Sequence, residues 1–334
     1  MNRKAISLIS GGLDSILATK LVMEQGVEVV GFHFTSPFSS RKDKEGGARA
    51  IKTASELGID LITRHKENDY LEVLKNPKHG YGKNMNPCID CRIYMLKITT
   101  TLMEETGASF VVTGEVLGQR PMSQRRETIR LIEKESGLEG LIVRPLSAMR
   151  FTPTIPELEG LLDRDKLLGI TGRSRNTQYN LARKYNLQEF SKPGGGCLLT
   201  DPIFSVKLKE LFREEKDFTL RDIDLLSIGR HFRLMEGTKL IVGRDKEENE
   251  KLRNLCSSPY IFFSPVDFRG PEAILKGPLN DEIIKMVGNI IAFYGKNTSP
   301  AFSVQSDNGT IETHIVEKTG ENYERFRIQE RGSI

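Results

Sequence analysis

The chain has 334 residues, a formal net charge of +4, 38% hydrophobic and 28% charged residues. This length predicts more than one domain, each with its own core. The sequence contains no apolar run near 18 residues and no signal peptide, so we predict a cytoplasmic protein with no membrane contact. The mildly basic charge permits a polyanionic partner without requiring one.

Short apolar strands alternate with helices from residue 1 to about 120. The pattern predicts strands at 5–9, 27–34, 60–63 and 110–113, with helices at about 15–25 and 48–57. Repeated βα units of this kind predict an α/β fold with a doubly wound parallel sheet. Ligands of such sheets lie at the carboxyl ends of the strands, which directs attention to the loops that follow them.

The first such loop carries an anion-binding pattern, Ser10-Gly11-Gly12-Leu13-Asp14-Ser15. Two adjacent glycines let the backbone approach an anion closely, Ser10 and Ser15 add hydroxyl donors, and the following helix contributes its positive N-terminus. An ordinary glycine turn is the alternative. No lysine follows the glycines, so the pattern does not fit the phosphate loop of kinase-like NTPases.

This segment resembles the SGGxDS motif of the PP-loop ATP pyrophosphatases, in sequence and in its place after the first strand. The resemblance implies that the loop holds the pyrophosphate of ATP while the α-phosphate is attacked. The ATP-binding residues that it implies are Ser10, Gly11, Gly12, Asp14 and Ser15. Asp14 is also the candidate ligand of Mg²⁺ and a catalytic candidate, although it could simply cap the helix.

Four cysteines in a chain predicted to be cytosolic favour metal-binding, catalytic or buried roles over disulfides. Cys88 and Cys91 lie three residues apart where a loop over 75–87 meets a predicted helix, a geometry that suits a soft metal or an iron–sulfur cluster. Structural zinc, a redox dithiol and chance stay open. Cys197 follows the glycine stretch 193–196, whereas Cys256 has apolar neighbours and is predicted to be a core thiol.

Cys88, Cys91 and Cys197 could together hold a [4Fe–4S] cluster that leaves one iron free to bind sulfide. A CxxC pair with one distant cysteine resembles the PP-loop tRNA thiolases that use such a cluster. The resemblance implies that these three cysteines are catalytic residues as well as metal ligands. The competing interpretation is a persulfide route with Cys197 as the sulfur acceptor and a disulfide that closes the cycle.

The segment Thr113–Gln119 and the pair Ser123-Gln124 resemble the sequence TGESLGQ…SQ of 4-thiouridine synthases. This resemblance extends over residues 1–202 and implies that Gly114, Gln119 and Gln124 line the ATP site. That family carries a THUMP region before the first strand, and from this sequence we expect neither that region nor a rhodanese-like sulfur carrier. Free sulfide or an unrelated sulfur-donor protein is therefore the expected donor, and monomer and homodimer are both open.

Beyond residue 160 the chain becomes basic, which predicts either a solvated helix face or a contact with the tRNA backbone. The segments Ile228–Leu234 and Lys239–Asp245 resemble the NFACT-R family, which implies RNA binding, although Asp245 stands where that family usually has Asn. We predict a thiolase domain at 1–205, a smaller α+β RNA-binding domain at 206–300 and a β-rich tail at 301–334.

These resemblances imply ATP-dependent thiolation of tRNA, in which a uridine oxygen is adenylated and then replaced by sulfur, with 4-thiouridine the favoured product. Lys52, Arg92 and Lys97 are candidate charge stabilisers that the sequence does not rank. A persulfide-based 2-thiouridine enzyme, another PP-loop adenylating enzyme and a non-catalytic RNA-binding protein are the alternatives.

Overall fold

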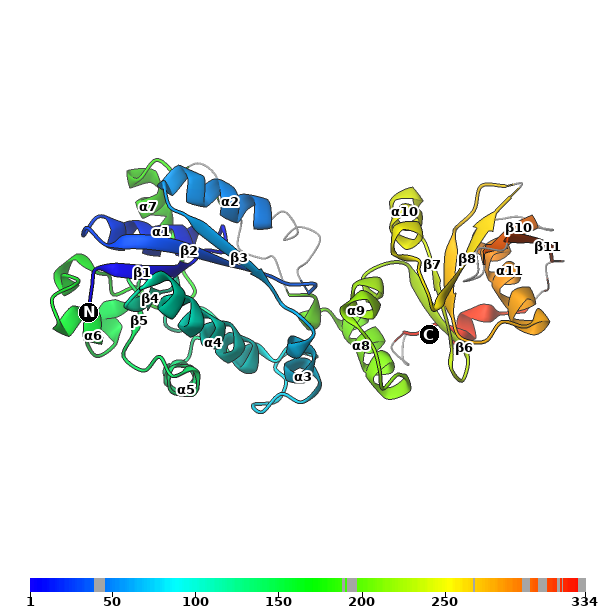
Figure 1. Ribbon diagram of the computed structural model, residues 1–334, viewed down its shortest axis with the longest axis horizontal. Helices are drawn as coiled ribbons and strands as arrows, with labels where there is room; N and C mark the ends of the chain where they lie inside the picture. The colour runs from blue at the N-terminus through cyan, green and yellow to red at the C-terminus, as the bar shows by residue number, and fades with distance from the viewer. Residues whose placement is uncertain are drawn as a thin grey trace. The chain divides into compact units, whose positions relative to one another are not determined.

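The computed structural model describes residues 1–38, 46–187, 190, 197–266, 268–295, 301–305, 311–316, 319 and 321–329. The chain divides into two compact units, Met1–Thr200 and Asp201–Ile334 (Figure 1). No helix within the described ranges is long and apolar enough to cross a membrane. The Pro-Gly-Gly-Gly stretch at 193–196, which the sequence predicts to present Cys197, lies outside the described residues.

The N-terminal unit is built on a five-stranded parallel sheet, which confirms the predicted α/β fold. Its strand order is β3-β2-β1-β4-β5. The strands are β1 (Lys4–Leu8), β2 (Glu28–Thr35), β3 (Leu61–His65), β4 (Phe110–Val112) and β5 (Ile142–Val143), and the helices are α1 (Leu13–Met23), α2 (Gly46–Leu57), α3 (Asp69–Lys75), α4 (Cys88–Thr106), α5 (Arg126–Ser136), α6 (Ile155–Leu158) and α7 (Asn176–Lys184).

Helices cover both faces of this sheet, because neighbouring residues of a strand point to opposite sides. In β1, Ala5 packs with α1 and α7, and Ile6 packs with α4 and α5. Figure 1 shows these two helical layers above and below the strands. Strands buried on both faces read as continuous apolar runs, which is why the alternation of βα units was visible in the sequence.

The order of the strands reverses beside β1. The chain runs from β1 outward through β2 to β3, and then returns to place β4 on the other side of β1. A crevice forms at such a reversal, at the carboxyl ends of the two strands involved. The loops that follow β1 and β4, which begin at Ile9 and Thr113, therefore meet at one place.

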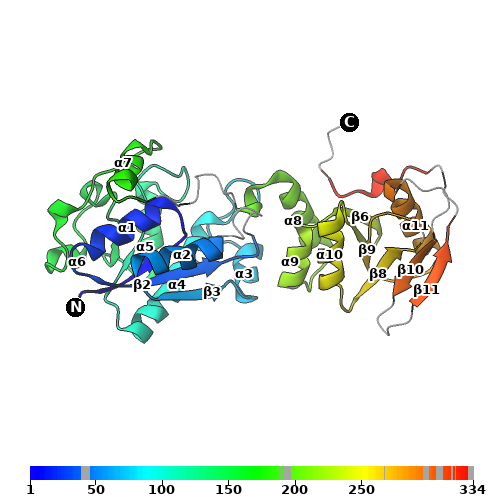
Figure 2. The same ribbon diagram turned by 90° about the horizontal axis from the view of Figure 1, so that it is seen from above.

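The C-terminal unit contains a six-stranded antiparallel sheet of order β11-β10-β8-β9-β7-β6. Figure 2 shows α11 on one side of this sheet and α9 and α10 on the other. The strands are β6 (Arg230–Met235), β7 (Thr238–Val242), β8 (Tyr260–Pro265), β9 (Ala273–Lys276), β10 (Ala301–Gln305) and β11 (Ile311–Ile315), and the helices are α8 (Pro202–Glu214), α9 (Leu220–Leu226), α10 (Lys246–Leu255) and α11 (Asp281–Gly295).

Two domain limits differ from the predicted ones. Helix α8 starts after Asp201, whose side chain accepts a hydrogen bond from the Phe204 backbone, so the second unit begins before residue 206. The segment after residue 300 is not a separate tail, because β10 pairs with β8 along four residues. At the opposite edge, Ile328 donates its backbone N–H to the His231 carbonyl oxygen at 2.8 Å and thereby covers part of β6.

Candidate active site

The turn after β1 has the geometry of an anion-binding site. Helix α1 begins at Leu13. Its N-terminal cap is Gly12, which has no side chain to bond the first N–H groups of the helix. Gly11 adopts φ +71°, a conformation that strains any residue with a Cβ atom. The buried Ser15 hydroxyl donates to the Gly12 carbonyl oxygen at 2.8 Å and lies 3.2 Å from the Ser10 hydroxyl. The N-terminus of α1, which favours anions, therefore lies beside two hydroxyl groups.

Gly114 is the point where the two loops touch. A Cβ atom at this position would lie 2.5 Å from the Asp14 carbonyl carbon and 2.6 Å from the Ser15 nitrogen. Both atoms belong to the backbone and cannot rotate away. Only glycine allows the end of β4 to pass this close to the turn after β1, so the resemblance and the packing select the same residue.

Asp14 is held in place by residues that are far away in the sequence. Gln119 donates its side-chain N–H to Asp14 Oδ2 at 2.7 Å, and Arg175 Nη2 lies 3.1 Å from the same oxygen. Buried Gln178 in turn donates to Gln119 Oε1 at 3.1 Å. The other carboxylate oxygen of Asp14 is buried and has no hydrogen-bond partner in the described part of the chain.

The structure brings most of the predicted nucleotide residues together. Gln124 lies beside this network rather than in it, because its side-chain oxygen accepts from the Arg120 backbone and its carbonyl oxygen from Gly118. It shapes the loop that carries Gln119. The sequence did not identify Gln178, and it placed Arg175 only within the basic stretch for which a solvated face and a tRNA contact stayed open.

The thiols of Cys88, Cys91 and Cys197 form a second group of side chains, and all three are half-buried. Cys88 and Cys91 lie in the first turn of α4. Cys197 precedes the short helix η3 (Leu198–Thr200), which is anchored by a hydrogen bond from the Met85 backbone to the Leu199 carbonyl oxygen at 3.0 Å. Besides burial, the neighbouring Cys91 and Cys88 raise the pKa of Cys197, and all three thiols add to the effect of burial on the pKa of Tyr70, so the three cysteines lie in one neighbourhood. They are not arranged as a preformed metal site, since no group of three His, Cys, Asp or Glu in the described ranges could hold a metal ion.

Lys66 is the neighbour that distinguishes Cys91 from the other two thiols. The Lys66 ammonium lies 2.9 Å from Cys91 Sγ and 4.1 Å from the centre of the Tyr70 ring, and the lysine is only 7% exposed. Burial opposes ionisation of Cys91, but the charge and hydrogen bond of Lys66 outweigh it and lower the pKa of this thiol. Burial raises the pKa of Cys197 to about 11.

A buried ion-pair chain lies next to this group. Glu115, which is 4% exposed, accepts from Arg144 Nε at 3.0 Å and lies 3.0 Å from Arg92 Nη2. Burial alone would raise the pKa of Glu115, but the two guanidinium groups reverse this effect and lower it. Arg144 also pairs with Glu133. The charge of Arg92 is therefore paired with that of Glu115. Lys52 and Lys97, the other candidate charge stabilisers, lie on exposed helix faces.

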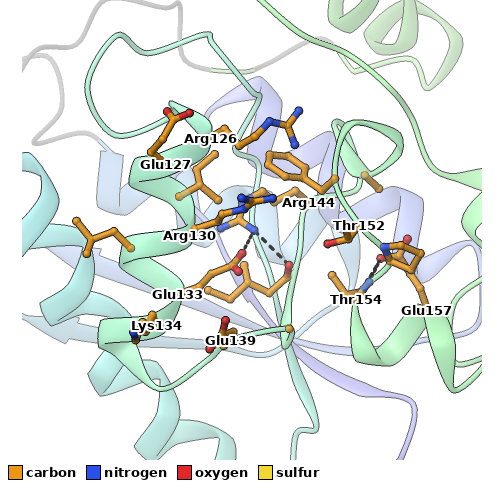
Figure 3. Close-up of a pocket in the computed structure, with 17 residues that line it drawn as sticks. Arg126, Glu127, Arg130, Glu133, Lys134, Glu139, Arg144, Thr152, Thr154 and Glu157 are labelled. Atoms are coloured by element: carbon orange, nitrogen blue, oxygen red, sulfur yellow. Dashed lines mark hydrogen bonds and ion pairs between the residues drawn. The ribbon is translucent and has the colours of Figure 1, made fainter.

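A cavity of about 450 Å³ opens between α5 and the segment that follows β5 (Figure 3). Arg144 lies in its wall and points toward Glu133. The charges of the lining are balanced, since it contains Arg126, Arg130, Lys134 and Arg144 against Glu127, Glu133, Glu139 and Glu157. None of the predicted nucleotide or thiol residues lines this cavity, and its neutral charge does not favour an anion.

Two remaining predictions differ in detail. Arg164, one residue of the basic stretch for which the sequence left a solvated face and a tRNA contact open, instead pairs with Glu157 and donates to the Ala148 and Phe151 carbonyl oxygens. Cys256 is half-buried rather than fully buried, and its sulfur lies 3.6 Å from the Tyr260 carbonyl oxygen at the edge of an apolar cluster. Both residues have structural roles.

Each of the two units contains a region that matches a known family. Residues 1–152 match the ThiI family, described as thiamine biosynthesis protein (ThiI). Residues 229–326 match the RNA binding domain of NFACT proteins. The two matches confirm the resemblances seen in the motifs, and they place the nucleotide turn, Gly114, Lys66 and the Cys88–Cys91 pair within the ThiI-like region.

The curated relatives are named probable tRNA sulfurtransferases. The protein from Methanothermobacter thermautotrophicus is 26% identical over 196 residues, which are 58% of this chain and 43% of the relative. The protein from Thermococcus kodakarensis is 32% identical over 143 residues, which are 43% of this chain and 36% of the relative. The chain thus spans about two fifths of the length of these relatives.

Similar solved structures include a 4-thiouridine synthetase–RNA complex with bound ATP, at 24% identity and a TM-score of 0.37, covering 66% of this chain and 52% of the other. A U34-tRNA thiolase from Methanococcus maripaludis, solved with its [4Fe–4S] cluster, is 17% identical with a TM-score of 0.34, covering 64% of this chain and 67% of the thiolase.

Proposed function

We propose that this protein uses ATP to replace a uridine oxygen of tRNA with sulfur, with 4-thiouridine as the favoured product. The observation that carries the proposal is the presence, in one unit with a ThiI-like region, of an anion-binding turn with its Asp14 network and of a cysteine pair with Cys197 in its neighbourhood. The names of the curated relatives support the same reaction class.

The turn Ser10–Ser15 would bind the β- and γ-phosphates through the N-terminal N–H groups of α1. Gln119 and Arg175 occupy one carboxylate oxygen of Asp14, which leaves the buried, unpartnered oxygen to bind Mg²⁺. Attack of a uridine carbonyl oxygen on the α-phosphate would release pyrophosphate and leave the oxygen as part of an AMP leaving group. The protein would supply positioning and stabilisation of charge.

The three cysteines fit a [4Fe–4S] cluster in their chemistry, although they are not preassembled around a metal position. Cys88, Cys91 and Cys197 would hold the cluster, which would bind the donor sulfide that replaces the uridine oxygen. The persulfide route is the second candidate, because it requires fewer of these thiols to meet and no preformed ligand group. Iron and acid-labile sulfide content distinguishes the two.

The C-terminal unit would hold the tRNA. Phe293 on α11 is 54% exposed and lies edge-on to Tyr294, over which Arg230 is placed at 4.2 Å. An exposed ring beside a stacked guanidinium is a platform for an unpaired base. Phe293→Ala is expected to weaken tRNA binding by about 1–3 kcal/mol, the usual contribution of one stacked base. Val266→Ala, at another exposed apolar residue of this unit, is the matched control.

The decisive experiment is nucleoside mass spectrometry of unmodified tRNA after anaerobic incubation with iron-reconstituted protein, ATP, Mg²⁺ and sulfide. A thiolated uridine, identified against 4-thio and 2-thio standards, is the expected product. Asp14→Asn should abolish it and Asp60→Asn, an exposed carboxylate, should not. Cys256→Ala is the control for alanine variants of the other three cysteines. ATP hydrolysis to AMP without sulfur incorporation would favour another adenylating enzyme, and no turnover would favour an RNA-binding protein.

A further inference from the structure

Lys66 is a buried cation without a carboxylate partner. Among the described residues, no Asp or Glu lies within ion-pair distance of its ammonium group, and its close contacts are Cys91 Sγ and the face of Tyr70. A charge that is removed from water needs an opposite charge or a set of hydrogen bonds to compensate for the lost hydration. The aromatic ring supplies only part of this compensation.

Within the described part of the chain, Arg92 also acts on Cys91, but its charge is already neutralised. Arg92 is paired with Glu115, which also binds Arg144, and Arg144 is paired with Glu133. This chain of two arginines and two glutamates has no net charge. Among the described residues, Lys66 is therefore a positive charge beside the thiols that no carboxylate pairs, and Cys91 Sγ is the atom placed to carry the balancing negative charge.

Tyr70 closes the same space from the other side. Its ring is fully buried and its hydroxyl makes no regular hydrogen bond among the described residues, yet it lies near enough to Cys91 to interact with that sulfur. A tyrosine hydroxyl is a hydrogen-bond donor. The Lys66 ammonium and the Tyr70 hydroxyl, both from buried residues, thus lie beside one sulfur, an arrangement that stabilises an anion.

From this geometry we infer that Lys66 is a positioning residue, the charge partner of the sulfur centre that the three cysteines build. The inference rests on the proposed sulfur chemistry but extends beyond it. Three thiolates around a [4Fe–4S]²⁺ core have a net charge of one negative unit, which a single ammonium balances. A cysteine persulfide in its anionic form would have the same charge.

The test compares Lys66→Met, which removes the charge, with Lys66→Arg, which keeps it, in the full chain reconstituted anaerobically with iron and sulfide. Lys66→Met is expected to lower the iron affinity by about 10–100-fold, the usual effect of losing a partner of metal ligands. It should also shift the midpoint potential of the cluster to a lower value, because the reduced, more negative cluster loses its nearest cation. Lys66→Arg should restore both properties.

Equal iron affinity and equal potential in wild type and Lys66→Met would overturn the inference. If the wild-type protein binds no iron at all, the proposed cluster is rejected, and the role of Lys66 is then decided by alkylation of Cys91 with iodoacetamide at neutral pH. In that case Lys66→Met should slow alkylation by roughly tenfold relative to Lys66→Arg. An unchanged rate would overturn the inference there as well.

Discussion

The nucleotide turn and the thiol site of the N-terminal unit are constructed in opposite ways. The turn is six consecutive residues whose anion-binding groups are mostly backbone N–H, fixed by a strand on one side and a helix on the other. The thiol site gathers Lys66, Tyr70, Cys91 and Cys197 from separate segments and uses side chains alone. A contiguous site tolerates changes elsewhere, whereas an assembled site depends on every segment that contributes to it.

The largest expected effect concerns the ion-pair chain beside the thiols. Glu115→Gln leaves Arg144 buried with one fewer charge partner and should lower the free energy of unfolding by about 3–5 kcal/mol, measured by urea denaturation. Glu105→Gln removes an exposed ion pair with Arg64 at 3.9 Å and should change the free energy of unfolding by less than about 1 kcal/mol. Equal changes in the free energy of unfolding for the two substitutions would show that burial does not strengthen the ion pairs of Glu115.

The same residue predicts a pH dependence with a defined sign. Because Arg92 and Arg144 lower the pKa of Glu115 in the folded protein, despite its burial, the carboxylate stabilises the fold at every pH above its ordinary value of 4.5. This stabilisation is lost as the pH falls through the lowered folded-state pKa. The difference in unfolding free energy between wild type and Glu115→Gln should therefore be constant from pH 7 to about 5 and shrink under stronger acid. A difference that grew toward low pH would contradict the sign.

A smaller loss is expected at the contact between the two loops of the nucleotide site. Gly114→Ala forces a Cβ atom against the Asp14 and Ser15 backbones and should cost about 1–3 kcal/mol of stability, as overpacking usually does. Isothermal titration calorimetry should also show weaker ATP binding, because the turn must move. Gly47→Ala in α2 meets no atom within 4 Å and is the control. If both variants bind ATP like wild type, the close approach at Gly114 has no role in binding.

The smallest change in stability is expected for Ser10→Ala in the nucleotide turn. Within the described part of the chain, the Ser10 hydroxyl makes long hydrogen bonds, at 3.3 Å to the Gly12 nitrogen and 3.2 Å to the Ser15 hydroxyl. The free energy of unfolding should therefore change by less than about 1 kcal/mol. ATP affinity should fall more than stability does. Ser109→Ala, which loses a surface contact with Asn2, should leave ATP affinity unchanged.

The sequence predicted the parts that are local. Strand–helix alternation predicted the parallel sheet, and the SGGLDS turn and the CxxC pair were visible as contiguous motifs. Lys66 was missed although it directly follows β3, the position where a parallel sheet presents its ligands. Gln178 and Glu115 were missed as members of the site because their roles depend on contacts 59 residues away to Gln119 and 29 residues away to Arg144. No periodic pattern encodes such contacts.

The hydrogen bond from Ile328 to His231 and the bridge between Arg327 and Phe232 make the end of the described chain a partial extra strand on β6. An uncovered sheet edge presents unpaired N–H and C=O groups to other molecules, which favours intermolecular pairing. A truncated protein that ends before Tyr323 would therefore expose the β6 edge of the sheet. Such a form should elute from a sizing column in larger species than the full chain, even though every residue of the nucleotide and thiol sites is retained.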